Sequence, residues 1–259
     1  MRRAIAYSYA RLSNSLPRGW RDFFFQLGLW LGFILAYQVA RGIAGHGTLT
    51  AFQNGQLIID TERRLHSLVE LRIQRVVLNA GDWLVDLLNW TYWNAEFTIL
   101  FLALLWVYLR RNESFLRVRN ALFFSNMLAL IGFVLMPTAP PRLFPSLGFV
   151  DTLNTSSWLN HGSGLVNLLS NQFAAMPSLH SSDALIIGFA MAALVRSRAA
   201  RVFWTLWPSW VWFTVMATGN HYWLDVAAGI ALALLAGTLA VGIEVLRRSD
   251  DQLDSAALP

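Results

Sequence analysis

The feature that most limits how this chain can fold is a series of apolar runs, each close to the length that crosses a bilayer. A helix needs roughly 17–25 mainly apolar residues to span the hydrocarbon core. Shorter runs are tolerated where loops cover the helix ends or a polar cavity enters the membrane. The runs therefore predict an all-α, polytopic membrane bundle with six transmembrane helices, at Phe23–Ala40, Tyr92–Leu109, Ala121–Met136, Leu179–Val195, Val202–Ala217 and Leu224–Leu246.

The composition excludes several kinds of chemistry. Only 14% of the 259 residues are charged, whereas a soluble domain usually carries about 25%. The chain has no Lys, which removes mechanisms that depend on a P-loop or a Schiff base. It also has no Cys, which removes disulfides, thiolate nucleophiles and Cys-type zinc sites. No cofactor is expected.

The positions of the Arg residues predict the orientation of the bundle. Most of them lie before the first run, between the second and third, between the fourth and fifth, or after the sixth. The positive-inside rule makes that side cytoplasmic. Both termini are then inside, and the basic isoelectric point reflects topology in a plasma membrane, with no nucleic-acid partner. The Arg residues concerned are Arg2, Arg3, Arg11, Arg18, Arg21, Arg110, Arg111, Arg117, Arg119, Arg196, Arg198, Arg201, Arg247 and Arg248.

We expect a single membrane domain over residues 1–259, with four segments outside the bilayer. Residues 1–22 and 247–259 are cytoplasmic, and the last residues of the chain, DDQLDSAALP, are a polar tail that should fray. Residues 41–91 have apolar positions at helical spacing, which predicts one or two amphipathic helices. They lie either on the outer membrane surface or over the bundle as a packed lid. Residues 137–177 form an ordered outer loop rich in Pro, Ser, Asn and Gly.

Two histidines at the outer ends of predicted spans are the leading functional candidates. His180 opens the fourth run and His221 opens the sixth. Asp225 lies four residues after His221, so the two share one helix face, and Asp183 is similarly placed three residues after His180. Ionisable groups at such positions are costly and therefore suggest function. Glu96 and Asn94 have weaker support for the same cavity, while His46, His66, His161 and Asp151 are interpreted as ordinary loop residues.

These residue types suit phosphate chemistry. A carboxylate that binds one imidazole nitrogen fixes the tautomer, so the other nitrogen can act as nucleophile, base or metal ligand. A second His can protonate a leaving group. A phosphate also needs a cation, and without Lys the candidate is Arg142, which follows Pro140 and Pro141 in the outer loop.

Two other functions remain open at this point. One is metal-dependent hydrolysis with His180, Asp183, His221 and Asp225 as ligands, although no metal is expected. The other is a non-catalytic transporter or scaffold that uses the same polar groups for binding or proton relay.

The motifs resemble those of the type-2 phosphatidic acid phosphatase superfamily. The resemblance rests on Pro-Ser-x-His at residues 177–180 and His-x-x-x-Asp at residues 221–225. The segments PTAPPR at 137–142, GFVDT at 148–152, AAMPSLH at 174–180 and GNHYWLD at 219–225 resemble the inositolphosphotransferase branch, which includes inositol phosphorylceramide synthases. The likeness covers roughly residues 50–246.

The resemblance implies a role for each motif residue. His221 would be the nucleophile that forms a phosphohistidine, Asp225 its partner, and His180 the acid. Arg142 and Ser178 would contact the phosphate. Apart from the resemblance, Asp183 could orient His180, bind a polar substrate headgroup or pair with another span. The chain departs from the superfamily where a Lys usually precedes the first-motif Arg and where an Arg usually stands six residues before the nucleophile, a position occupied here by Val215.

Taken together, these features predict an integral membrane lipid phosphatase or phosphotransferase with its site at the outer leaflet. It would cleave a lipid phosphate ester or diester through a phosphohistidine, and could transfer inositol phosphate or a similar headgroup to a lipid acceptor. With fewer cations, either other donors such as Asn220 and backbone N–H groups also bind the phosphate, or the substrate is a phosphodiester, which carries less charge. The alternative within this class is simple hydrolysis of lipid monophosphates or isoprenyl diphosphates.

Overall fold

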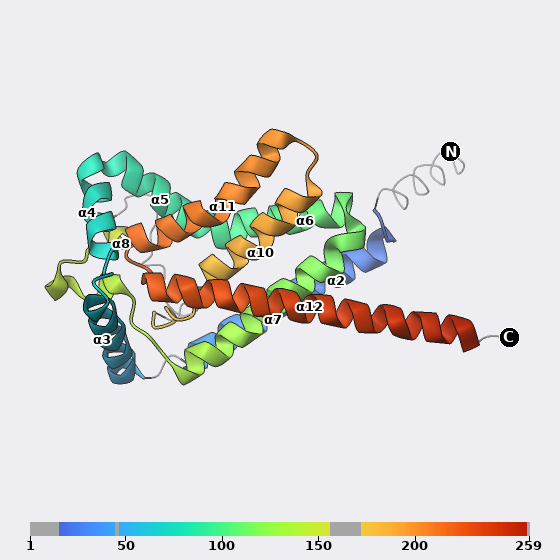
Figure 1. Ribbon diagram of the computed structural model, residues 1–259, viewed down its shortest axis with the longest axis horizontal. Helices are drawn as coiled ribbons and strands as arrows, with labels where there is room; N and C mark the ends of the chain where they lie inside the picture. The colour runs from blue at the N-terminus through green and yellow to red at the C-terminus, as the bar shows by residue number, and fades with distance from the viewer. Residues whose placement is uncertain (1–15, 45–46, 156–171, 258–259) are drawn as a thin grey trace, which may run out of the picture.

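The protein is all-helical in a computed structural model that describes residues 16–44, 47–155 and 172–257 (Figure 1). Its helices are α2 (Gly19–Ala44), α3 (Thr48–Arg64), α4 (Glu70–Ala80), α5 (Asp82–Asn94), the π-helix η1 (Ala95–Ile99), α6 (Leu100–Arg110), α7 (Asn112–Leu135), the 3₁₀ turns η2 (Pro141–Leu143) and η3 (Pro145–Leu147), α8 (Thr152–Thr155), α10 (Leu179–Leu194), α11 (Arg198–Ala217) and α12 (Trp223–Ala257).

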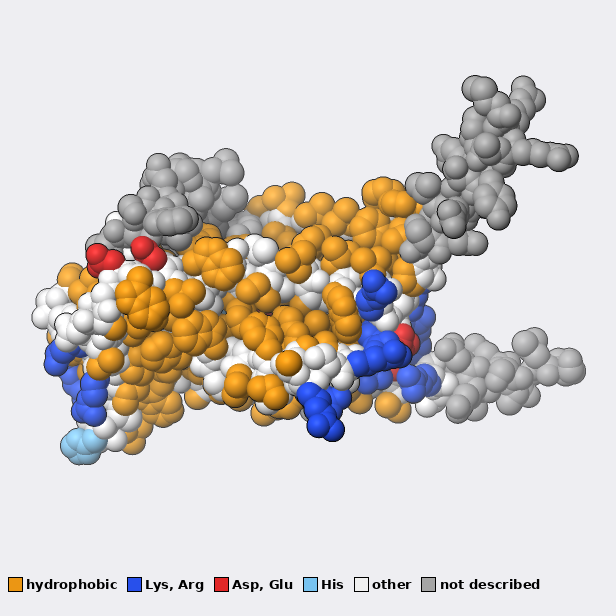
Figure 2. All heavy atoms as spheres, turned by 90° about the horizontal axis from the view of Figure 1, so that it is seen from above, with side chains coloured by type: hydrophobic (Ala, Val, Ile, Leu, Met, Phe, Trp, Pro, Cys, Tyr) orange, Lys and Arg blue, Asp and Glu red, His pale blue; other side chains and the backbone are white. Residues whose placement is uncertain are grey.

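Four segments of the described chain are long and apolar enough to cross a membrane. They are Gly19–Val39, Asp82–Arg110, Asn112–Leu135 and Trp223–Ser249, and α10 is a shorter apolar helix. Large apolar side chains such as Phe25, Leu135 and Leu246 are exposed, as lipid-facing residues are. In Figure 2 hydrophobic side chains cover much of the middle of the visible face, and Arg side chains lie towards both of its ends. The protein is therefore a membrane protein with several candidate spans, while the count of six stays a prediction.

The two ends of the bundle differ. The start of α2, the α6–α7 turn and the C-terminal end of α12 lie towards one end in Figure 1. The start of α12 lies towards the other end, with α3, α4 and α8 near it. Helices α3 and α4 bury Ile58, Ile59 and Val77 against neighbouring elements. Helices α3 and α4 thus form a lid that packs over this end of the bundle.

Helix α10 is the inner element of the bundle. It packs against α6, α7, α11, α12 and η1. The Ser178 hydroxyl accepts a hydrogen bond from Ser181 N (3.3 Å) and caps the helix. On the side of α11, Gly188 allows close approach, because a Cβ there would lie 2.7 Å from Pro208 Cγ. Protein contacts on most sides explain how a 16-residue helix can be accommodated at the centre.

Two helices extend beyond the limits that the sequence predicted. The helix that contains Tyr92 begins earlier, because α5, η1 and α6 run together from Asp82, so the last ten residues of the predicted outer segment belong to this candidate span. The positive φ of 112° at Gly81 separates α4 from α5 and sets the start of α5. The first part of the predicted polar tail is helical, since α12 continues to Ala257.

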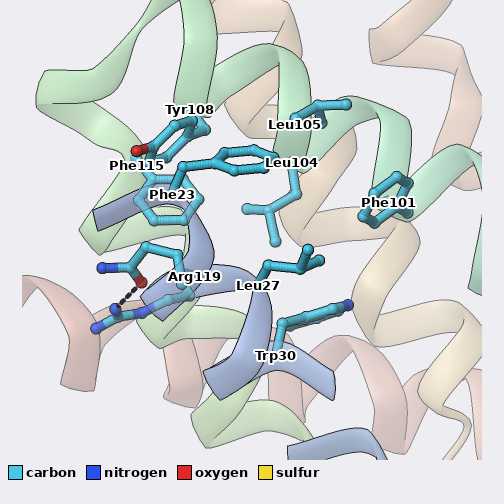
Figure 3. Close-up of a pocket in the computed structure, with 10 residues that line it drawn as sticks. Phe23, Leu27, Trp30, Phe101, Leu104, Leu105, Tyr108, Phe115 and Arg119 are labelled. Atoms are coloured by element: carbon cyan, nitrogen blue, oxygen red, sulfur yellow. Dashed lines mark hydrogen bonds between the residues drawn. The ribbon is translucent and has the colours of Figure 1, made fainter. Parts of the chain in front are cut away.

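A separate apolar cavity lies between α2, α6 and α7, with an empty volume of about 470 Å³. Phe23, Leu27 and Trp30 line one wall, and Leu104 and Tyr108 another (Figure 3). Arg119 donates from Nη1 to Gln26 Oε1 (2.6 Å) at its polar edge. None of the histidine motifs contributes to this cavity.

Candidate active site

His221 is held by its Nδ1 atom. That nitrogen lies 2.8 Å from the carbonyl oxygen of Ala175 and 3.4 Å from Asp225 Oδ2. A carbonyl oxygen only accepts hydrogen bonds, so Nδ1 carries the proton and Nε2 holds the lone pair. Asp225 Oδ2 also accepts from Tyr222 N (2.9 Å), which ties the carboxylate to the turn before α12. The arrangement fixes the ring of His221 through Nδ1 and directs the lone pair to Nε2.

His180 is held by its opposite nitrogen. Its Nε2 lies 3.1 Å from Glu96 Oε2 and 3.2 Å from the Tyr92 carbonyl oxygen. The Tyr92 ring stacks on the imidazole with centroids 4.2 Å apart. Both polar partners are acceptors, so Nε2 carries a proton and any acid chemistry belongs to Nδ1. Glu96 lies in η1, and π-helical turns are frequent at functional sites.

The two histidines lie close together because α10 and α12 meet at their N-terminal ends. Their ring centroids are 5.9 Å apart. The backbone N–H of Ser178 donates to the Asp225 carbonyl (3.1 Å), which joins the two motifs directly. Gly229 permits this approach, because a Cβ there would collide with the Ser178 carbonyl.

Arg142 lies against the turn that carries His221. Its Nε donates to Asn220 Oδ1 (2.9 Å), and its backbone N–H donates to the Gly219 carbonyl (2.8 Å). Its Nη1 lies 3.6 Å from Asp151 Oδ2. Gly219 has a φ of 71°, a conformation that favours glycine. A guanidinium is therefore fixed beside the histidine pair.

The side chains of Ser178 and Asp183 make their hydrogen bonds within α10 and with α7. Ser178 is fully buried, and its oxygen accepts from Ser181 Oγ (2.9 Å) in addition to capping α10. Asp183 faces α7, where Asn126 Nδ2 lies 3.4 Å from both carboxylate oxygens. The carboxylate seen on His180 is Glu96, not Asp183.

Some residues have contacts that the sequence did not predict. Asp151, interpreted as an ordinary loop residue, pairs with Arg142. Glu96 was only weakly indicated, and its position one turn after Tyr92 was the available signal. Asn94, named beside it, instead donates to the carbonyl of Trp90 in its own helix (2.8 Å). His46 and His161 lie outside the described residues.

A buried tyrosine, Tyr222, joins the turn that carries His221 to the loop before Arg142. Tyr222 is fully buried, and its hydroxyl donates to the Ala139 carbonyl (3.1 Å). Burial is the main reason that the pKa of Tyr222 lies well above its ordinary value, so the hydroxyl remains a hydrogen-bond donor. Within the described ranges, no group of three or more His, Asp or Glu side chains is arranged to hold a metal ion.

These observations define a class: an all-helical membrane protein with a buried pair of histidines, each anchored by an acceptor, beside an Arg. The model of the PAP2 superfamily matches residues 56–239 and so includes every residue of this site. The chain therefore belongs to the PAP2 superfamily, as the motif resemblance implied.

Two individual proteins are similar to the chain. The phosphoinositol dihydroceramide synthase of Bacteroides thetaiotaomicron is 28% identical over 140 residues, which cover 49% of this chain and 45% of that protein. The match thus spans less than half the length of this curated relative. The crystal structure of Aquifex aeolicus LpxE is 16% identical, covers 66% of this chain and 94% of that chain, and has a TM-score of 0.48.

Proposed function

We propose that this protein is a membrane lipid phosphatase or phosphotransferase that works through a phosphohistidine on His221. The observation that carries the proposal is the complementary anchoring of two adjacent imidazoles. His221 is fixed through Nδ1 and His180 through Nε2, with ring centroids 5.9 Å apart. Family membership supports the same chemistry.

The proposed reaction has two displacements. In the first, the Nε2 lone pair of His221 forms a bond to phosphorus, and the bond from phosphorus to the leaving oxygen breaks. The leaving oxygen keeps that electron pair and takes a proton from Nδ1 of His180. In the second, the acceptor oxygen attacks phosphorus and loses its proton to His180, while the P–N bond breaks and its electrons return to Nε2. Arg142 stabilises the non-bridging oxygens.

The finer proposal is a phosphodiester substrate and transfer of inositol phosphate, or a similar headgroup, to a lipid hydroxyl. Val215 supports it, because this residue stands where the superfamily usually has an Arg and is fully buried in an apolar cluster. A diester carries less charge than a monoester and needs fewer cations. The name of the Bacteroides relative, phosphoinositol dihydroceramide synthase, points in the same direction.

The test is to offer the purified protein phosphatidylinositol with a ceramide-type acceptor, lipid monophosphates, and isoprenyl diphosphates, and to identify the products by mass. A new inositol-phosphate lipid is the expected product, whereas free phosphate alone would favour simple hydrolysis. His221→Ala should abolish turnover and the acid-labile phosphohistidine adduct. Unchanged turnover in that variant would exclude the mechanism.

We further propose six spans, with both termini cytoplasmic and the site open to the outer face of the plasma membrane. The absence of Cys makes this directly testable. A single cysteine at the exposed position Ser146, in η3, should react with an impermeant maleimide added to intact cells, and one at the exposed position Glu113, at the start of α7, should react only after the cells are permeabilised. Equal labelling of both from outside would contradict the orientation.

A further inference from the structure

Two carboxyl groups of the outer lid hold the start of the helix that follows His221. Glu70 Oε1 accepts from Trp223 N (2.6 Å), and Glu62 Oε1 accepts from Leu224 N (3.3 Å). These N–H groups belong to the first turn of α12, where no intrahelical acceptor exists. The lid therefore supplies the N-terminal acceptors of α12 from α3 and α4.

Both carboxyl groups are fully buried in an acidic environment. Glu62 and Glu70 have no exposed surface, and neither appears in an ion pair among the described residues. The second oxygen of each, together with Asp225 Oδ1, is buried without a hydrogen-bond partner in the described part of the chain. The titratable groups that face the pair are Asp225 on α12 and Tyr222 in the preceding turn. If Glu62, Glu70 and Asp225 were all ionised, their three buried carboxylates would repel one another strongly.

Protonation removes that conflict. Burial first, and the adjacent Glu70 second, raise the pKa of Glu62 to about 9. Burial also raises the pKa of Glu70. At neutral pH the pair thus carries at least one proton, and a protonated Glu62 still has an oxygen free to accept from Leu224 N.

We propose that Glu62 and Glu70 are positioning residues for His221, which act as a proton-sharing acidic pair that fixes the first turn of α12. The inference rests on the proposed function, because it assigns these residues to the same reaction. Trp223 lies two residues after His221, and Leu224 immediately precedes Asp225. A lost acceptor at either position therefore displaces the nucleophile or its partner without touching the substrate.

The variants separate positioning from mere folding. Glu62→Gln keeps the acceptor oxygen and imitates the protonated acid. We therefore expect its kcat to lie within about two-fold of the wild-type value at pH 7. Glu70→Ala removes an acceptor, and we expect kcat to fall about 10–100-fold with little change in KM, since misplacement of about 1 Å can cost about 100-fold. Asp60→Asn is the matched control, because Asp60 is a half-exposed acid on the same helix as Glu62 and pairs with Arg63 away from α12.

The dependence of activity on pH distinguishes positioning from a purely structural role, because a structural role alone would not change the shape of that dependence. In wild type, loss of the Glu62 proton near pH 9 adds a charge beside Glu70 and Asp225, so activity should fall there. Glu62→Gln should lose this alkaline fall, while Asp60→Asn should keep it. An alkaline limb that is unchanged in Glu62→Gln, or a wild-type kcat in Glu70→Ala, would overturn the proposal.

Hydrogen exchange of the full-length protein tests the same inference without any substrate. Glu70→Ala should accelerate exchange of the Trp223 and Leu224 amides, and Asp60→Asn should not. If wild type turned over no phospholipid, the proposed function would fail while this measurement still decided the positioning role. Unaltered exchange in Glu70→Ala would reject the positioning role even in an active enzyme.

Discussion

Substitution of Gly229 by Ala should separate the two histidines while leaving every motif residue in place. Gly229 lies one turn after Asp225 on α12 and faces the start of α10. A Cβ at this position would lie 3.0 Å from Ser181 Cβ and would collide with the Ser178 carbonyl. The neighbouring atoms are backbone or the first side-chain carbon, so no flexible group can move aside.

The size of the effect follows from this geometry. Non-bonded carbon atoms prefer a separation of about 3.5–4.0 Å, so the contact with Ser181 alone requires the helices to part by about 0.5–1 Å. Ser178 is two residues before His180, and the shift is therefore transmitted to the acid. A displacement of about 1 Å lowers kcat/KM about 100-fold. Overpacking should also destabilise the fold by about 1–3 kcal/mol.

Gly237→Ala is the control, because Gly237 lies on the same helix and a Cβ there would meet nothing within 4 Å. It should retain full turnover and gain about 0.5–1 kcal/mol from the better helix propensity of Ala. Turnover of phospholipid by the purified variants, with thermal unfolding measured in the same detergent, provides both readouts. If Gly229→Ala matched Gly237→Ala in kcat/KM, close contact between α10 and α12 would not set the site geometry.

Three further substitutions and one treatment test other parts of the site. Asp225→Asn should slow phosphohistidine formation about 100-fold, less than the roughly 10⁴-fold loss in the serine-protease triad, because the Ala175 carbonyl still holds His221; rapid-quench labelling measures the rate. Glu96→Gln should lower kcat about 10-fold with KM unchanged, since loss of such a supporting carboxylate typically costs about 10–100-fold; an unaltered kcat would exclude a role for the contact with His180. Burial raises the pKa of Glu62 from the ordinary 4.5 to about 9 in the folded protein. The contribution of Glu62 to stability is therefore greatest below pH 4.5 and declines as the pH rises to 9. Glu62→Gln should raise the melting temperature at pH 8 and change it little at pH 4. Exhaustive chelation should leave turnover intact, and loss of activity restored by a divalent cation would revive the metal mechanism.

The sequence predicted the helical architecture and the core of the site, because both depend on local patterns. Apolar runs identify helices through their length, and four of the predicted runs lie in candidate spans. His221 and Asp225 are neighbours on one helix turn and needed no long-range information. The start of α5 was missed because Asp82 and Asp86 lower the local hydropathy, although the helix accommodates them at its outer end.

The supporting carboxylates could not be predicted, because their partners lie far away along the chain. Glu62 contacts a residue 162 positions later, and Glu70 contacts one 153 positions later. Both stand in a polar, amphipathic segment, where a Glu ordinarily faces water. Glu96 likewise contacts His180 only after η1 and α10 have packed. Periodicity indicates that a helix has two faces, but it does not identify which distant group each face meets.

The hydrogen bond between His221 and Ala175 has an evolutionary consequence. The acceptor is a main-chain carbonyl, and every amino acid at position 175 supplies one. No substitution at position 175 removes this acceptor, whereas any substitution of Asp225 removes or moves the carboxylate. The residues that position 175 can accept are therefore limited by the space around the side chain, which is 2% exposed, and not by the hydrogen bond itself. Lineages that lost Asp225 would still inherit a correctly protonated imidazole, and with it a starting point for regaining activity.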